Sequence, residues 1–154
     1  MGGGLVDGER PAMTGTKKAQ LLLAAALLAL IAQPARPGCL RYEPAEVELV
    51  GVMTRETFPG RPNYESVEAG DEPETHWILA LEKPVCVDGT KGDDTDVSER
   101  GVQRLQLVLS QDQYAACGFL LGRKVRVSGT LFHAITGHHH TSVLMTVGRI
   151  EPAA

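Results

Sequence analysis

The chain has 154 residues, of which 43% are hydrophobic, 22% charged and 5% aromatic, and its formal net charge is −4. This length suits one ordinary domain, and the composition excludes a coiled coil, a collagen-like fibre and a mostly disordered chain. From Cys39 onward, 11 Lys and Arg residues stand against 17 Asp and Glu residues. Because proteins that bind nucleic acids carry a basic surface, this acidic balance argues against a nucleic-acid partner.

Residues 1–38 are typical of a signal peptide with an N-terminal leader. Lys17 and Lys18 precede an apolar run over residues 19–32, and prolines follow it. The run is shorter than the roughly 20 residues that a membrane-spanning helix needs. We therefore predict no stable membrane anchor, a periplasmic or secreted location in bacteria, and a single domain over residues 39–154.

Alternating apolar residues predict five strands and one helix in this domain. Ser110 is a plausible cap for a helix over residues 111–121. The order strand, strand, strand, helix, strand, strand is that of a small OB-like Greek-key barrel, which is all-β with one helix. The predicted strands cover residues 46–55, 76–81, 102–109, 124–133 and 141–150.

Within the first predicted strand, the apolar face changes side near Gly51. A β-bulge at this glycine would explain the change. Residues 57–75 and 88–99 are rich in proline, glycine and acidic residues, which predicts two long loops. The acidic loop lacks the spacing of a calcium-binding loop, so we expect it to be solvated.

The three cysteines, Cys39, Cys86 and Cys117, all follow the leader. Cys39 and Cys86 adjoin predicted strands, whereas Cys117 falls in the predicted helix, so the first two are the best disulfide pair. A disulfide that closes the loop between them would stabilise the fold by about 4 kcal/mol in the chain-entropy model. Three free cysteines in a reducing compartment are the alternative.

Three stretches of the sequence resemble a family of exported bacterial proteins classed as domain of unknown function 4431. They are FPGRPNYESV, HWILALEKPVCV and LGRKVRVSGTLFHAITGHHHTSVLMTV, which start at Phe58, His76 and Leu121. The resemblance covers nearly the whole domain and implies export and the domain boundaries. It brings no catalytic residue. Cys117 falls outside the family pattern, which favours Cys39 and Cys86 as the pair.

His133 and the run His138, His139 and His140 form an unusual group of imidazoles that suggests zinc, copper or nickel. A two-residue turn at Thr136-Gly137 would bring His133, His138 and His140 onto one face as metal ligands. A three-residue turn keeps both apolar faces together by pairing Leu131 with Val143, and we prefer it. The alternatives to a metal site are histidines that bond loop backbone and a proton-linked switch.

The two loops that form the binding rim of an OB-fold correspond here to residues 58–64 and 135–140. Prolines stiffen the first of them, which lowers the entropy lost on binding. Alternatively, the loop folds back and Phe58 and Tyr64 fill one end of the domain. The predicted ligand-binding surface consists of Phe58, Arg61, Asn63, Tyr64, Trp77, His138, His139 and His140.

The sequence therefore favours an exported, non-catalytic binding or interaction module for an unknown envelope protein or small ligand. A histidine-based metal-binding protein that uses zinc, copper or nickel is the alternative. A small hydrolase ranks third, since the chain has no G-x-S-x-G, H-E-x-x-H or phosphate-loop motif.

Overall fold

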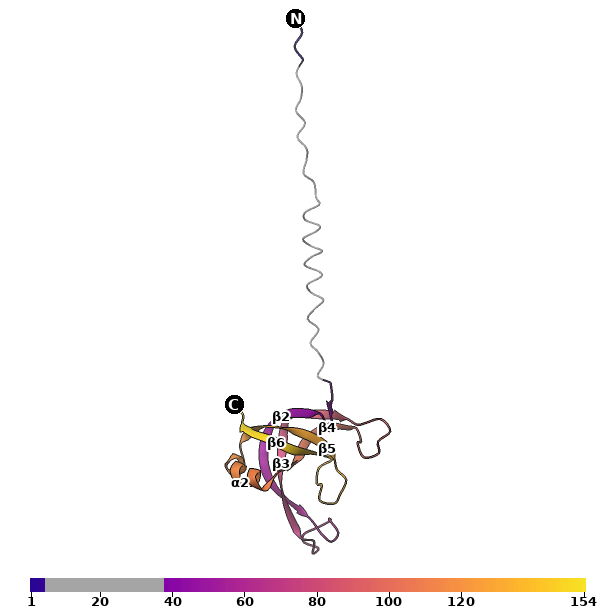
Figure 1. Ribbon diagram of the computed structural model, residues 1–154, viewed down its shortest axis with the longest axis vertical. Helices are drawn as coiled ribbons and strands as arrows, with labels where there is room; N and C mark the ends of the chain where they lie inside the picture. The colour runs from indigo at the N-terminus through magenta and orange to yellow at the C-terminus, as the bar shows by residue number, and fades with distance from the viewer. Residues whose placement is uncertain (5–37) are drawn as a thin grey trace. The chain divides into compact units, whose positions relative to one another are not determined.

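A computed structural model of the protein describes residues 1–4 and 38–154. The predicted signal segment lies largely outside these residues. Gly38–Ala154 form one compact unit, which is mostly β with one short helix (Figure 1). Its elements are β1 (Leu40–Arg41), β2 (Glu46–Pro59), β3 (Pro73–Asp88), β4 (Glu99–Val108), α2 (Gln111–Cys117), the 3₁₀ helix η1 (Gly118–Leu120), β5 (Lys124–His133) and β6 (Val143–Pro152).

The six strands form one mixed sheet in which five strands follow each other in a ring. β2 pairs antiparallel with β3 and β5, β3 pairs with β4, and β5 pairs with β6. A parallel ladder between β4 and β6 completes the ring. The short strand β1 adds to β3 in parallel. The predicted order of strands and helix is thus present, with β1 as an addition.

The strand β2 does not contain the predicted bulge. Leu49, Gly51 and Met53 are all buried, so one face points inward without a switch. The β2 ladders with β3 and β5 both run through Gly51 without a register shift. Gly51 has a different reason to be glycine, because a Cβ there would collide with the carbonyl oxygen of Ala80 on β3.

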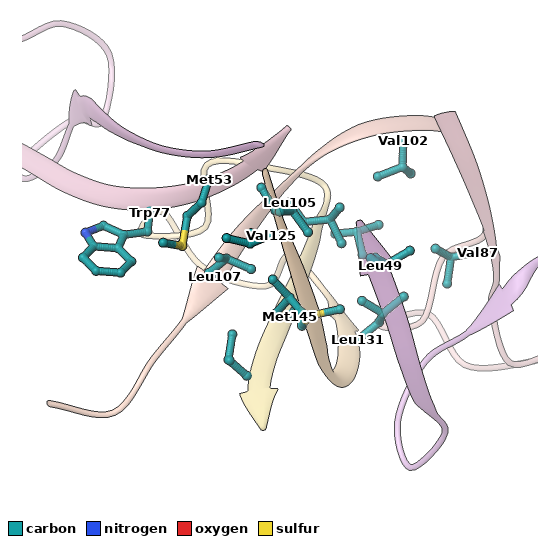
Figure 2. Close-up of a cluster of buried hydrophobic side chains, with 14 of the residues drawn as sticks. Leu49, Met53, Trp77, Val87, Val102, Leu105, Leu107, Val125, Leu131 and Met145 are labelled. Carbon is teal, nitrogen blue, oxygen red and sulfur yellow. The ribbon is translucent and has the colours of Figure 1, made fainter. Parts of the chain in front are cut away.

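The main core fills the inside of the ring with side chains of β2, β3, β4, β5 and β6, most of them at odd-numbered positions. Figure 2 shows Met53 and Trp77 at one end of this cluster and Val87 and Val102 at the other. Leu79, Leu105, Val125 and Leu131 are fully buried. Burial of each such side chain stabilises the fold by about 2 kcal/mol.

Both turns considered for the β5–β6 hairpin are wrong. Leu131 pairs with Met145, not Val143, and the ladder ends where His133 pairs with Val143. Residues 134–142 leave the sheet as a loop, and a register shift between Ser128 and Gly129 alters the pairing further along. The pairing still keeps the two apolar faces together, since a shift by two residues preserves the side to which each side chain points.

The predicted disulfide between Cys39 and Cys86 is present. It lies beside the pairing of Leu40 with Val87, so it fastens β1 to β3. Cys117 is free, ends α2 and packs partly buried against the core. Within the part of the chain that the structure describes, we find no helix with the length and apolar character needed to span a membrane.

Candidate functional site

The outer face of β3 carries polar side chains, in contrast to its inner face. Glu74 pairs with Phe58 of β2, and Ile78 pairs with Gln106 of β4. Because side chains alternate along a strand, Glu74, His76 and Ile78 point away from the core side chains Trp77 and Leu79. The loop of residues 134–142 brings further histidines to this face.

Glu74 is the centre of a group of polar side chains that we call the Glu74 cluster, consisting of Glu74, His76, His138 and His140. Glu74 Oε1 lies 2.7 Å from His138 Nδ1, and Glu74 Oε2 lies 3.3 Å from His140 Nε2. His76 Nε2 lies 3.5 Å from the same Oε2. One carboxylate therefore faces three imidazoles from a strand and a loop.

Aromatic side chains from the first long loop and from β2 pack against this cluster. The Phe58 ring stacks on His140 with a centroid distance of 4.5 Å and an angle of 4° between the planes. The Tyr64 hydroxyl lies 3.1 Å from His138 Nε2. Residues 58–64 and 135–140, which the sequence predicts to share a site, thus meet at these contacts.

Burial and hydrogen bonding together shift the pKa values of Glu74 and His76. Burial acts to raise the pKa of Glu74, but hydrogen bonds from His138 and His140 and the nearby His76 hold that pKa below its usual range. Burial lowers the pKa of His76, and the neighbouring His140 and His138 lower it further, against the opposing effect of Glu74. These directions favour a charged carboxylate beside a neutral His76.

Three members of the cluster lie close enough together to hold a metal ion. Glu74, His76 and His140 each offer one ligand atom, and these three atoms lie within 4.8 Å of one another. Zinc bonds of about 2.0–2.1 Å in a tetrahedral site place ligand atoms roughly 3.3 Å apart. The distances from Glu74 Oε2 to His140 Nε2 and His76 Nε2, 3.3 and 3.5 Å, match this separation.

His76 Nε2 is the atom that ordinary hydrogen bonding leaves unexplained. Among the residues described, it is a buried side-chain nitrogen without a hydrogen-bond partner. Buried polar atoms normally have a partner, and one that lacks it marks a place for a ligand or ion. His76 Nε2 lies within 4.8 Å of ligand atoms of Glu74 and His140, so a cation that prefers nitrogen and oxygen donors could bind here.

His133 does not join the other predicted metal ligands. Its Nε2 lies 3.1 Å from Glu99 Oε1 and its Nδ1 lies 3.0 Å from the carbonyl oxygen of Ala134. Both ring nitrogens thus face oxygen acceptors, and neither directs a free lone pair toward a metal. The His133 ring packs edge-on against the ring of Tyr42. Burial and the charges of Glu99 and Asp96 raise the pKa of Tyr42 to about 12.

His139 also points elsewhere, although it neighbours two members of the cluster. Its Nδ1 accepts a hydrogen bond of 3.0 Å from the backbone N–H of Ile135, and its ring packs edge-on against Phe132. Burial, together with the nearby His138, lowers the pKa of His139. It holds the loop of residues 134–142 in shape.

Trp77 lies in the core and not on the predicted surface, because odd-numbered residues of β3 face inward. It is 7% exposed and packs edge-on against Tyr114 of α2. Arg61 is exposed, and its carbonyl oxygen accepts a hydrogen bond from the backbone N–H of Glu72. Of the surface predicted from sequence, Phe58, Tyr64, His138 and His140 come together.

Asn63 belongs to a network that positions Tyr64. The buried carboxylate of Asp71 accepts hydrogen bonds from the backbone N–H groups of Asn63, Glu65 and Ser66. These bonds lie on both sides of Tyr64, whose φ of 60° is in the left-handed region that costs about 1 kcal/mol or more. Asp71 therefore holds a strained residue so that its ring meets His138.

Sequence reasoning missed Glu74, His76 and Gln106. The spacing of Glu74 and His76 was a usable signal, because residues that are two positions apart on a strand share one face. Gln106 is 4% exposed, and its side chain bonds His76 and the backbone of the loop of residues 134–142. A glutamine between two leucines of an alternating strand gives no such signal.

The fold and the site together define a mixed-sheet domain with a histidine and glutamate cluster on its outer face. Residues 104–151 match the model of a family described as "Domain of unknown function (DUF4431)", which confirms the resemblance for that segment. The matched segment contains Gln106 and His138 to His140 but not Glu74 or His76. No curated protein matches the chain.

Proposed function

We propose that the protein is an exported transition-metal-binding domain, with zinc as its first candidate ion and copper and nickel as alternatives. The observation that carries this proposal is the set of three ligand atoms from Glu74, His76 and His140, with the unpartnered His76 Nε2 among them. Two imidazoles and a carboxylate suit these metals and do not suit calcium or magnesium.

The fold of this domain is, in our proposal, an OB-type barrel. The ring order β2, β3, β4, β6, β5 and the parallel pairing of β4 with β6 support it. In that fold the loops between the first two and the last two strands form the binding rim. Here these loops contain Tyr64 and His138, which contact each other beside the cluster.

Export rests on two observations of different kinds. The basic and apolar pattern before residue 38 is typical of a secretory signal. The Cys39–Cys86 disulfide suits an oxidising compartment such as the periplasm or the extracellular space. A metal site in such a compartment would operate without competition from the reducing thiols of the cytosol.

His138 bonds the proposed ligand Glu74 through Nδ1 and Tyr64 through Nε2, so in our proposal it orients Glu74 and is not a fourth ligand. It is more exposed than the other cluster members. Three protein ligands and an exchangeable fourth position are typical of open zinc sites, whereas four protein ligands are typical of structural ones. The number of ligands therefore separates a site that takes a further molecule from one that only stores metal.

Calorimetric titration of the purified protein with zinc chloride at pH 7.5 tests the proposal. We expect one zinc per chain, and loss of binding in His76→Ala and in His140→Ala. His133→Ala is the matched control, because the same change is made at a histidine bonded to Glu99 instead of Glu74. Absence of binding, or loss of binding in the control alone, would contradict the proposal.

A second candidate function is the interaction module, in which the rim contacts an envelope protein. The stacking of Phe58 on His140 and the contact of Tyr64 with His138 favour it, since they form a continuous preorganised surface. Capture of a partner that survives His76→Ala but not Tyr64→Ala would support this function over metal binding.

A further inference from the structure

Gln106 connects the Glu74 cluster to the loop of residues 134–142. Its side-chain oxygen accepts a hydrogen bond of 2.8 Å from the backbone N–H of His140. Its side-chain nitrogen lies 3.0 Å from the carbonyl oxygen of His138 and 3.2 Å from His76 Nδ1. The backbone N–H of Gln106 also donates to the Thr141 hydroxyl over 2.9 Å. Gln106 thus anchors three successive parts of the loop.

These contacts fix the orientation of the Gln106 amide. A backbone N–H can bond only the amide oxygen, and a backbone carbonyl oxygen can bond only the amide nitrogen. The bonds to His140 and His138 therefore leave an N–H of the amide facing His76 Nδ1. His76 Nδ1 must be the acceptor of that bond, and the single proton of the neutral ring lies on Nε2.

The metal site requires the opposite arrangement. A metal at His76 Nε2 needs the lone pair of that nitrogen, so the proton of the neutral ring must lie on Nδ1. An N–H at Nδ1 cannot coexist with the N–H of Gln106 that now faces it. The amide of Gln106 has to turn or withdraw, and its bonds to His138 and His140 then break.

We infer that Gln106 holds His76 in the tautomer that does not bind metal, so that metal binding at His76 releases the loop of residues 134–142 from β4. This inference rests on the proposed function and adds its regulation, because the ion competes with the hydrogen bonds by which Gln106 holds the backbone of the loop. Release of the loop would also free His138, because Gln106 bonds the carbonyl oxygen of that residue. The loop then becomes the element that reports the bound ion to a partner.

The tautomer is measured directly by nuclear magnetic resonance of the imidazole nitrogens in the purified protein. Without metal, we expect the proton of His76 on Nε2 and a bare Nδ1. A His76 proton on Nδ1 in the metal-free protein would overturn the inference. On addition of zinc, the proton should move to Nδ1, and hydrogen exchange of the His140 amide should accelerate at least 10-fold.

The same titration separates the two proposals. Absence of any change on addition of zinc contradicts the proposed function, and the metal-free tautomer still tests the role of Gln106. Binding of zinc with an unchanged His140 amide overturns the inference alone, because the loop then stays anchored to β4.

Gln106→Glu provides a second test, which acts at His76 and also removes the hydrogen bond to the His138 carbonyl oxygen. A carboxylate at this position accepts a hydrogen bond from His76 Nδ1–H, and such partners change metal affinity by roughly 10–100-fold. We expect zinc to bind at least 10-fold more tightly in this variant. Gln103→Glu is the matched control, since it adds the same charge at an exposed position of β4. Equal gains in both variants would overturn the inference.

Discussion

The two faces of β3 differ in how completely their side chains are satisfied. On the inner face, Trp77 and Leu79 are buried among apolar neighbours. On the outer face, Glu74 bonds His138 and His140, while the nitrogen of His76 beside them has no partner. The same strand therefore combines an apolar inner face with an outer face on which one buried nitrogen has no hydrogen-bond partner.

This difference teaches where to look for function in a domain of this size. The inner face uses only the apolar alternation that any strand of the ring needs. The outer face places one carboxylate and three imidazoles near one another, which the fold does not require. Changes on the two faces should accordingly separate stability from binding.

The largest effect on stability should come from the inner face. Leu79 is fully buried, so Leu79→Ala leaves a cavity and should reduce the free energy of unfolding by about 3 kcal/mol. Chemical denaturation measures this change. The folded variant should still bind one zinc, and loss of zinc binding in the folded state would show that the two faces are not separate.

Removal of the central carboxylate should have a smaller effect on stability and a larger one on binding. Glu74→Gln removes the charge that His138 and His140 bond, which should cost about 2 kcal/mol. Zinc affinity should fall at least 10-fold. Glu72→Gln is the matched control, because Glu72 is exposed and lies outside the cluster. Similar zinc affinity in both variants would contradict the role of Glu74.

Substitution of His76 should change stability least among the core and cluster variants. Its Nδ1 accepts one hydrogen bond from Gln106 and its Nε2 has none, so His76→Ala should cost about 1 kcal/mol. Thermal denaturation in the presence and absence of zinc measures the effect. The unsubstituted protein should gain thermal stability with zinc, and the variant should not. A gain of stability with zinc in the variant would exclude His76 as a ligand.

The loop that positions Tyr64 should respond to acid. Backbone hydrogen bonds from Ser66, Asn63 and Glu65 lower the pKa of Asp71 from its usual value of 3.8. A carboxylate with a lowered pKa stabilises the folded state fully above its unfolded pKa, and this stability is lost as the pH falls through the lower folded-state pKa. Asp71→Asn should therefore lower the melting temperature at pH 6 and have a smaller effect near pH 2.5. An equal effect at both pH values would contradict this origin.

Much of the fold follows from local patterns in the sequence. β5 covers Lys124–His133 as predicted, because its alternation of apolar and polar residues is regular. β2 and β3 extend beyond their predicted ends into Phe58 and Glu74, where the outer face is polar and the alternation gives no sign of a strand. The helix ends at Cys117, and a 3₁₀ turn replaces its predicted last residues.

The site was only partly predictable because it depends on pairing between strands. Phe58 and Tyr64 fall in one predicted loop and His138 and His140 in another, and the predicted topology brings these loops together. Glu74 and His76 enter only once β2 and β3 pair so that Phe58 lies opposite Glu74. The failure at His133 has the same origin, since the long loop after β5 carries His138 and His140 away from that strand and over β3.

A crystal structure of the protein grown with zinc, with anomalous scattering recorded at the zinc edge, tests the central claim most directly. We predict one strong peak at about 2.0–2.1 Å from Glu74 Oε2, His76 Nε2 and His140 Nε2. A peak beside His133 and Glu99, or crystals that take up zinc only between molecules, would contradict the assignment of the Glu74 cluster as the metal site.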